Sequence, residues 1–269
     1  MLRQRGFTLV ELVIVIVLLG IVATISTQFV SLSVRGAIDL GDRQQRALQG
    51  VVISEQITRE IREAFPLSVR AEALGCLEWL PILGGTTYES LPFDEEETTF
   101  SITSFSDDAL EAINDQEARL VVYGYGVPRN ELYNYDSDPG PVSPKVNSIS
   151  SDGEVTLSSG HRFTQRSPQK RIYAIGQPIS ICQKQNGVSK RLVRFSAYPA
   201  TTTQPSFSDL SSEESGVMSA NLWPDSLRFN VRPASLQRSA LVDFAFELVA
   251  PNSDERTRVS QEVHIRNVP

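Results

Sequence analysis

One acidic residue, Glu11, interrupts an otherwise apolar stretch near the start of the chain, RGFTLVELVIVIVLLG. A carboxylate near the centre of a lipid bilayer costs about 2.5–3.5 kcal/mol on insertion scales, so such a residue is a candidate functional group that needs a partner. The chain has only two histidines, His161 and His264, and two cysteines without a CxxC neighbour. These residues argue against a zinc site and leave Glu11 as the first group to explain.

One serine–lysine motif has the spacing of an acylation site. Ser167-Pro-Gln-Lys170 fits the S-x-x-K pattern of penicillin-binding enzymes, in which a lysine lies one helical turn from the nucleophilic serine. Pro168 and its polar neighbours argue against a buried helix there, and neither SDN nor KTG follows. We therefore expect a surface loop and no catalytic residue.

One acidic segment could bind a cation. Residues 134–140, NYDSDPG, cluster oxygen ligands as calcium-binding loops do, but the twelfth position of the loop is Lys145 rather than glutamate. We expect a solvated acidic turn, with no metal and no cofactor.

The net charge of this chain of 269 residues limits the classes of partner that it is expected to bind. Its formal net charge is −7 and its pI is about 5.0, which argues against a nucleic-acid-binding surface. The one basic cluster consists of Lys184, Lys190, Arg191 and Arg194. We expect it to be a solvated face, and nucleic acid is not an expected partner.

The element that carries Glu11 is predicted to be a membrane helix. The basic leader MLRQRG precedes an apolar segment from Phe7 to about Val30, and 24 residues make a helix of about 36 Å, which is enough to cross a bilayer. Arg3 and Arg5 should remain on the cytoplasmic side. A secretory signal has its small-residue cleavage site after the apolar core, whereas Gly6 lies before it.

The segment Gly6-Phe7-Thr8-Leu9-Val10-Glu11, behind a short basic leader, resembles the class III signal of type IV prepilins. The resemblance implies that a prepilin peptidase cuts between Gly6 and Phe7, removes residues 1–6 and methylates the new amine of Phe7. Glu11 lies four residues after Phe7, on the same helix face, so its carboxylate could be compensated by such a cationic amine. In that family the glutamate meets the N-terminus of a neighbouring subunit, which implies that the partner of Glu11 is another pilin.

The helix is expected to continue as an amphipathic segment over residues 31–65, where Pro66 is a stop signal. Ile53, Ile57, Ile61 and Ala64 fall on one stripe that should pack on a sheet, and Gly50 allows close approach. Gly36 and Gly41 interrupt the middle of the helix and could bend it. Many major pilins carry a proline where this sequence has Gln28, so a kink there is not expected.

Residues 66–269 are predicted to form a β-rich headgroup. Apolar and polar residues alternate at Leu227–Arg232, Val242–Leu248 and Val259–Arg266. Further strand candidates are CLEWLPI, TTFSIT, RLVVYGYG, KRIYAIG, ISICQK and KRLVRFSAY. Residues 136–151 and 200–219 are polar and are expected to be surface loops. One long helix followed by antiparallel strands predicts an α+β, pilin-like fold, with the helix packed on an antiparallel headgroup of one or two sheets. There is no βαβ alternation typical of a Rossmann enzyme.

The segments ITREIREAFPLSVR, GCLEWLPI, KRLVRFSAY and EVHIRNVP resemble the MshO group of mannose-sensitive haemagglutinin pilus biogenesis proteins, akin to pseudopilin J and PilW-like minor pilins. The resemblance implies a minor pilin in a tip or initiation complex, anchored in the inner membrane with a periplasmic headgroup and later part of an extracellular pilus. Its implied partners are other minor and major pilins, the prepilin peptidase and the inner-membrane assembly machinery. A recognition subunit that binds a surface, a glycan or DNA, a type II secretion pseudopilin and an anchored periplasmic enzyme are the alternatives, and the missing catalytic constellation argues against the enzyme. In a domain outside the cytoplasm we expect a disulfide between Cys76 and Cys182.

Overall fold

A computed structural model describes residues 8–185, 187–250 and 254–267. The chain divides into two units, Met1–Leu48 and Gln49–Pro269. One helix, α1 (Leu9–Arg62), begins in the first unit and ends in the second. The α+β, pilin-like architecture predicted from the sequence is confirmed, because a long helix is followed by antiparallel sheets.

From Leu9 onward, the first unit is the N-terminal part of α1. Gln28, Gly36 and Gly41 all have helical backbone. Among the described residues, α1 is the helix long and apolar enough to cross a membrane, with a mean hydropathy of 2.8 over its most apolar 18 residues.

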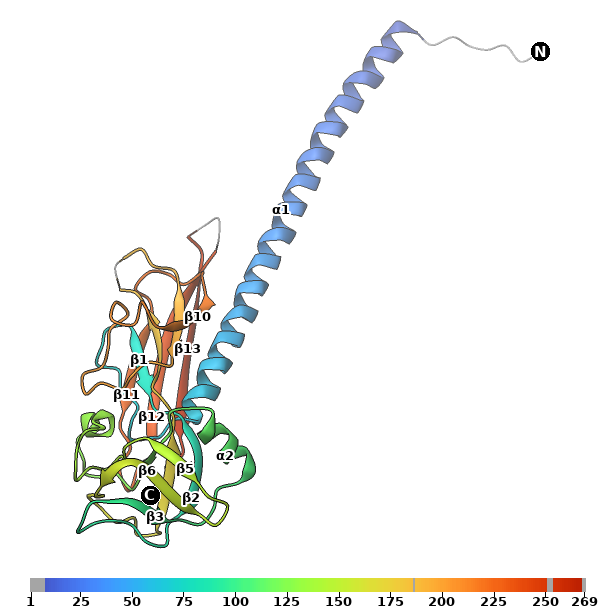
Figure 1. Cartoon of the computed structure of the whole chain (residues 1–269). Helices are drawn as coiled ribbons and strands as arrows, with labels where there is room; N and C mark the ends of the chain where they lie inside the picture. Colours follow the sequence, from blue (N-terminus) through green and yellow to red (C-terminus); the bar gives the residue numbers. More distant parts are fainter. Residues whose placement is uncertain (1–7, 186, 251–253, 268–269) are drawn as a thin grey trace. The chain divides into compact units, whose positions relative to one another are not determined.

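In its described residues, the second unit, the headgroup, contains the last turns of α1, two short helices and thirteen strands. Figure 1 shows how these elements are arranged. The first elements are β1 (Cys76–Trp79), β2 (Ile82–Thr87), β3 (Glu97–Ser101), α2 (Asp107–Asn114), β4 (Arg119–Val121) and the 3₁₀ helix η1 (Arg129–Tyr133). The central strands are β5 (Val146–Ile149), β6 (Glu154–His161), β7 (Arg171–Ile175), β8 (Ile179–Gln183) and β9 (Leu192–Ser196). The last strands are β10 (Glu214–Ser219), β11 (Arg228–Arg232), β12 (Ala240–Val249) and β13 (Arg256–Ile265).

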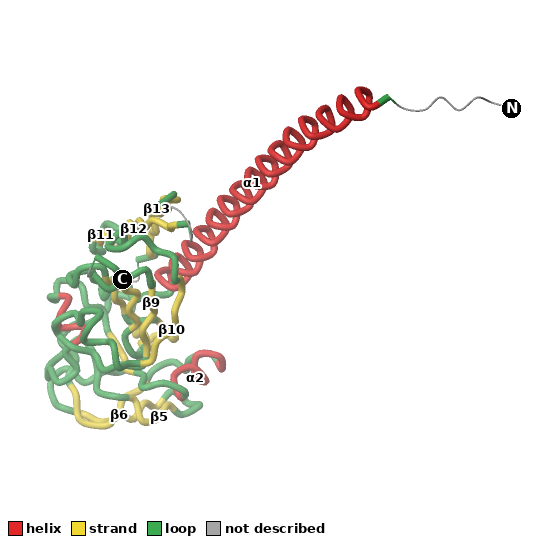
Figure 2. Tube along the Cα trace, turned by 90° about the horizontal axis from the view of Figure 1, so that it is seen from above, coloured by secondary structure: helices red, strands yellow, loops and turns green. Residues whose placement is uncertain are grey.

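Among the described residues the headgroup has four sheets rather than the one or two expected, and all strand pairs within these sheets are antiparallel. One sheet has four strands in the order β1-β8-β9-β10, and three sheets have three strands each, in the orders β11-β12-β13, β2-β7-β4 and β3-β6-β5. Figure 2 shows β9 beside β10 and β5 beside β6, in agreement with their pairing. In Figure 1 the sheets with β2, β3, β5 and β6 gather with α2 at one end of the headgroup.

The main core lies between α1 and the sheets that contain β1, β8, β9 and β11–β13. The four residues of the predicted stripe, Ile53, Ile57, Ile61 and Ala64, are each at most 3% exposed. They belong to one buried cluster with apolar residues of β12 and β13, namely Val242, Phe244, Phe246, Leu248, Val263 and Ile265. This confirms the predicted face of the helix, because apolar residues at spacings of three and four are removed from water together.

The second core belongs to the other end of the headgroup. It includes Ile102, Leu120, Val155, Phe163 and Ile172. Helix α2 packs on β2 and buries Ala109 and Ile113, which are one turn apart.

Several boundaries differ from the sequence-based expectations. Helix α1 ends at Arg62 rather than at residue 65, because Ala64 pairs with Pro81 and the Phe65 N–H donates to the Leu80 carbonyl at 2.8 Å. The backbone therefore leaves the helix and pairs with the segment at residues 80–81 before it reaches Pro66.

Both predicted surface loops contain strands. The segment 136–151 includes β5, and 200–219 includes β10, whose residues from Glu214 to Val217 are all exposed. A strand without a buried face has no apolar alternation, so periodicity could not reveal it. Conversely, RLVVYGYG is a strand only to Val121, since Tyr123, Gly124 and Gly126 adopt positive φ values of 61°, 79° and 80°.

Candidate functional site

The described part of the N-terminal motif forms a reciprocal cap at the start of α1. Thr8 lies at the N-cap, and its Oγ1 accepts a hydrogen bond from the Glu11 N–H at 3.3 Å. The Glu11 carboxylate in turn accepts from the Thr8 N–H and from the Thr8 hydroxyl, each at 3.4 Å. This is a capping box, which satisfies backbone donors that a helix start leaves unpaired.

The capping box gives Glu11 a role that the sequence interpretation missed, although the signal T-x-x-E was present at residues 8–11. The carboxylate is also held next to the positive end of the helix dipole. Gly6 and Phe7, the predicted processing and methylation residues, lie outside the described residues, so the pairing of Glu11 with an amine remains a prediction.

The helix beyond Glu11 presents apolar side chains to its surroundings. Every residue from 8 to 45 is exposed, including Leu18, Ile25 and Phe29. The hydroxyls of Thr24 and Thr27 donate to the carbonyls of Gly20 and Ala23 at 2.5 and 3.0 Å, so they are satisfied within their own helix. Such a surface requires lipid or other helices as its neighbours.

The headgroup holds a buried ionic cluster that no sequence pattern indicated. The Arg70 guanidinium pairs with Glu78, and the two side chains are 1% and 0% exposed. Arg70 also donates to the carbonyls of Thr201 and Thr202 at 2.7 and 2.9 Å, and its guanidinium carbon lies 3.5 Å from the ring centroid of Tyr133. The cluster therefore ties the segment after β9 to β1.

Burial controls the ionisation of this cluster. Desolvation raises the pKa of Glu78, and the hydrogen bond and charge of Arg70 oppose that shift. The Tyr198 hydroxyl donates to Glu78 at 2.9 Å and shares a 2.7 Å hydrogen bond with the Ser180 hydroxyl. Burial also raises the pKa of Tyr133 and Tyr198, so both phenols remain neutral donors. The cluster is closed to water and is suited to holding structure rather than to binding substrate.

The two cysteines lie opposite each other on paired strands. Cys76 of β1 is the register partner of Cys182 of β8, and the two form a disulfide with an S–S distance of 2.04 Å. Val193, Phe195, Tyr198 and Leu210 surround the bond as a small buried cluster. The predicted pairing is thus present in the structure.

The serine–lysine motif is not arranged for acyl transfer. Ser167 is 4% exposed, so the expected surface loop is wrong at this residue, whereas Lys170 is exposed. The Ser167 Oγ accepts from the Arg171 N–H at 3.0 Å, and the Ser167 N–H donates to the Tyr88 hydroxyl at 3.1 Å. Both bonds hold the loop before β7, which explains the burial.

The acidic turn at residues 134–140 is held by a cation of the protein. The Asp138 carboxylate accepts from the Arg162 backbone and guanidinium at 2.7–3.2 Å, and these bonds lower the pKa of Asp138. His161 lies beside it, with its Nδ1 3.7 Å from an Asp138 oxygen. Within the described ranges, no group of three or more His, Cys, Asp or Glu side chains could hold a metal ion.

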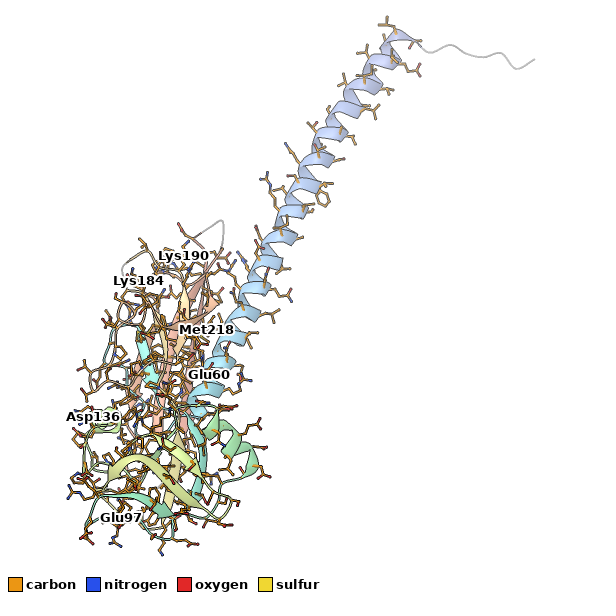
Figure 3. All side chains as sticks on the ribbon, in the orientation of Figure 1. Glu60, Glu97, Asp136, Lys184, Lys190 and Met218 are labelled. Atoms are coloured by element: carbon orange, nitrogen blue, oxygen red, sulfur yellow. A yellow bond between two sulfur atoms is a disulfide. The ribbon has the colours of Figure 1, made fainter. Side chains whose placement is uncertain are left out.

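One of the basic residues considered from the sequence, Arg194, lies apart from Lys184 and Lys190. Arg194 pairs with Glu60 of α1 at 2.7 Å, while Lys184 and Lys190 lie at one end of the headgroup, away from Glu60 and opposite Glu97 (Figure 3). His264 of β13 is 70% exposed and contacts Glu262 at 3.0 Å, as expected of a solvated histidine.

Residues 1–27 match the prokaryotic N-terminal methylation motif. Neither the curated proteins nor the solved structures compared with the chain gave a match. The matched segment contains the capping box and the start of the exposed apolar helix, and it fits membrane anchoring before assembly. Together these findings support a type IV pilin or pseudopilin, a class of structural proteins.

Proposed function

We propose that the chain is a minor pilin of a type IV pilus, similar to the MshO group, that acts in the tip or initiation complex. The observation that carries the proposal is the exposed apolar part of α1 with one carboxylate, Glu11, in its first turn. A helix of this kind can leave the bilayer only if other apolar helices cover it, and bundling with other major and minor pilins supplies that cover.

In this proposal residues 1–6 are a leader that the prepilin peptidase removes. Residues 7–30 anchor the chain in the inner membrane, residues 31–65 continue the helix, and residues 66–269 form the headgroup on the periplasmic side. The assembly machinery of the inner membrane then draws the subunit into an extracellular pilus. Glu11 meets the methylated amine of Phe7 of a neighbouring pilin.

Two alternatives share the same helix. A type II secretion pseudopilin of the J type would use it in a periplasmic pseudopilus, and a recognition subunit would add a ligand site on the headgroup. DNA is the weakest ligand candidate, because the chain is acidic and Arg194 of the basic group is paired.

Intact-mass spectrometry of membrane-extracted protein tests the processing step. Removal of residues 1–6 leaves 269 − 6 = 263 residues that begin with N-methylated Phe7. An N-terminus at Met1 or downstream of Thr24 would overturn the prepilin assignment.

The assembly role needs a separate measurement. We expect deletion of the gene to reduce pili on the cell surface, and purified fibres to contain the chain beside a major pilin. If secretion rather than piliation fails in the deletion strain, the pseudopilin alternative is correct instead.

A further inference from the structure

An open pocket of about 590 Å³ lies in the headgroup, and none of the described residues that line it belongs to the helix stripe or to the disulfide. Three segments line it: Leu67 after α1, residues 123–127 between β4 and η1 together with Arg129 at the start of η1, and residues 233–237 in the turn between β11 and β12. Its volume falls within the range of about 300–1,000 Å³ that is typical of small-molecule sites. No step of pilin assembly proposed above uses this pocket.

The wall of the pocket has unusual backbone geometry. Tyr123 has a φ of 61°, a region that bulky side chains rarely adopt, and it lines the pocket together with Gly124 and Gly126. A Cβ at Gly126 would have no neighbour within 4 Å, so this backbone borders open space. Strained residues of this kind concentrate at ligand sites, where the surrounding fold holds them in place.

The opposite rim is held by hydrogen bonds rather than by loose contacts. The Tyr125 hydroxyl donates to the Asn267 side chain, whose Nδ2 donates to the Ser235 carbonyl at 2.9 Å. This chain joins the turn at 233–237 to the segment at 123–129, so the pocket is formed before a ligand arrives. A preformed site avoids the entropy cost of ordering its walls on binding.

One lining residue carries a charge. Arg129 is the only Asp, Glu, Lys or Arg of the described residues that line the pocket, and its ion-pair partner, Glu72, lies 3.8 Å away with its side chain 62% exposed. An exposed pair of this kind contributes little free energy, so a ligand carboxylate can take the place of Glu72 at the guanidinium. The guanidinium can therefore form a bidentate pair with a carboxylate of a ligand.

The rest of the lining suits a sugar ring. Tyr123 and Tyr125 lie with ring centroids 5.1 Å apart, and Leu67 and Leu236 add apolar surface. Ser235 and Gln237 provide polar groups on the other rim. An aromatic side chain covers the C–H face of a pyranose, while polar groups bind its hydroxyls. We propose that this pocket binds a carboxylated pyranose, such as the uronic acid residue of an acidic glycan, with Arg129 on the carboxylate.

Saturation-transfer NMR on the full chain in detergent tests the proposal with two matched probes. Methyl galactopyranosiduronate carries the carboxylate, and methyl galactopyranoside has the same ring without it. We expect transfer to the uronate and at least a tenfold weaker affinity for the neutral sugar. In Arg129→Gln the affinity for the uronate should fall at least tenfold, whereas Arg191→Gln, which removes an equal charge from an exposed residue elsewhere, should bind as wild type does.

A second variant tests the location without removing charge. Gln237→Trp adds bulk at the exposed turn beside the pocket and should reduce uronate binding while the far-UV circular dichroism is unchanged. The proposal is wrong if neither sugar shows transfer, or if Arg129→Gln binds the uronate as well as Arg191→Gln does. Equal competition by benzoate would also overturn it, because the site would then select an aromatic acid rather than a sugar.

Discussion

Arg70 and Glu78 form an ion pair from which water is almost completely excluded, although one residue precedes the first strand and the other lies within it. The pair is joined by Tyr198 and by the carbonyls of Thr201 and Thr202. Since the partner charge would be left buried and unpaired, we expect Arg70→Leu to lower the free energy of unfolding by about 3–5 kcal/mol. Urea unfolding followed by tryptophan fluorescence measures the change.

The double variant Arg70→Leu/Glu78→Leu shows whether the loss of stability in Arg70→Leu comes from the buried Glu78 carboxylate that is left without a partner. Replacing both charges by apolar side chains is often neutral, so much of the lost stability should return. If the double variant is as unstable as Arg70→Leu, packing around Arg70 rather than the unpaired carboxylate explains the loss.

His161 should make the headgroup sensitive to mild acid. Its side chain is 2% exposed, and burial lowers its pKa below the ordinary 6.5. The charge of Arg162 lowers the pKa further, whereas Asp138 and the Gly140 backbone raise it. Because the unfolded chain takes up the proton first, the stability provided by neutral His161 is complete above pH 6.5 and is lost as the pH falls through the lower folded-state pKa. Unfolding free energies between pH 7.5 and 5 should show this slope.

The matched variants for this prediction are His161→Gln and His264→Gln. We expect the first to flatten the slope between pH 6.5 and 5, and the second, at an exposed histidine, to leave it unchanged. An unaltered slope in His161→Gln would assign the acid sensitivity to other groups.

Gly50 and Gly41 should respond in opposite ways to larger side chains. A Cβ at Gly50 would lie 2.7 Å from Val259 Cγ2 and 3.5 Å from Leu248 Cδ1, whereas a Cβ at Gly41 would have no neighbour within 4 Å. We expect Gly50→Leu to destabilise the headgroup by about 1–3 kcal/mol through overpacking. Gly41→Ala should favour the helix by about 1 kcal/mol. Thermal unfolding and helical circular dichroism distinguish the two, and a neutral Gly50→Leu would contradict the close packing.

Glu11 can be tested for its charge separately from its capping role. Glutamine can still complete a capping box but has no charge, so Glu11→Gln should be cut and inserted normally yet crosslink poorly to partner pilins and support fewer pili. Glu11→Val should behave in the same way and insert at least as well.

Thr8→Ala is the control for the cap. It keeps the carboxylate and removes the Thr8 hydroxyl, with an expected cost of about 1 kcal/mol at the helix start and with piliation largely retained. Wild-type piliation in Glu11→Gln, together with loss in Thr8→Ala, would show that capping rather than charge is what assembly requires.

The disulfide between Cys76 and Cys182 should be present in periplasmic protein. It closes a loop of about 107 residues, and removing a native disulfide costs about 2–5 kcal/mol. Peptide mapping without reduction should recover the linked pair, and Cys76→Ser/Cys182→Ser should unfold at a lower urea concentration. Free thiols at both positions would refute the pairing in the cell.

The amino-acid sequence by itself determined the features that depend on local order. The apolar run after Gly6 predicts the exposed helix, and spacings of three and four identify the buried face at Ile53, Ile57 and Ile61. Alternation of period two predicts β11, β12 and β13, because one face of each strand is more deeply buried than the other.

Only the tertiary structure decided which distant residues meet. Arg70 contacts carbonyls more than 130 positions later in the chain, and the pocket combines Leu67, Arg129 and Leu236 from three segments. Strand β10 has almost no buried face, so it leaves no periodic signal. These features arise from packing between segments whose separation in sequence carries no pattern, and their stability comes from burial that only the folded chain provides.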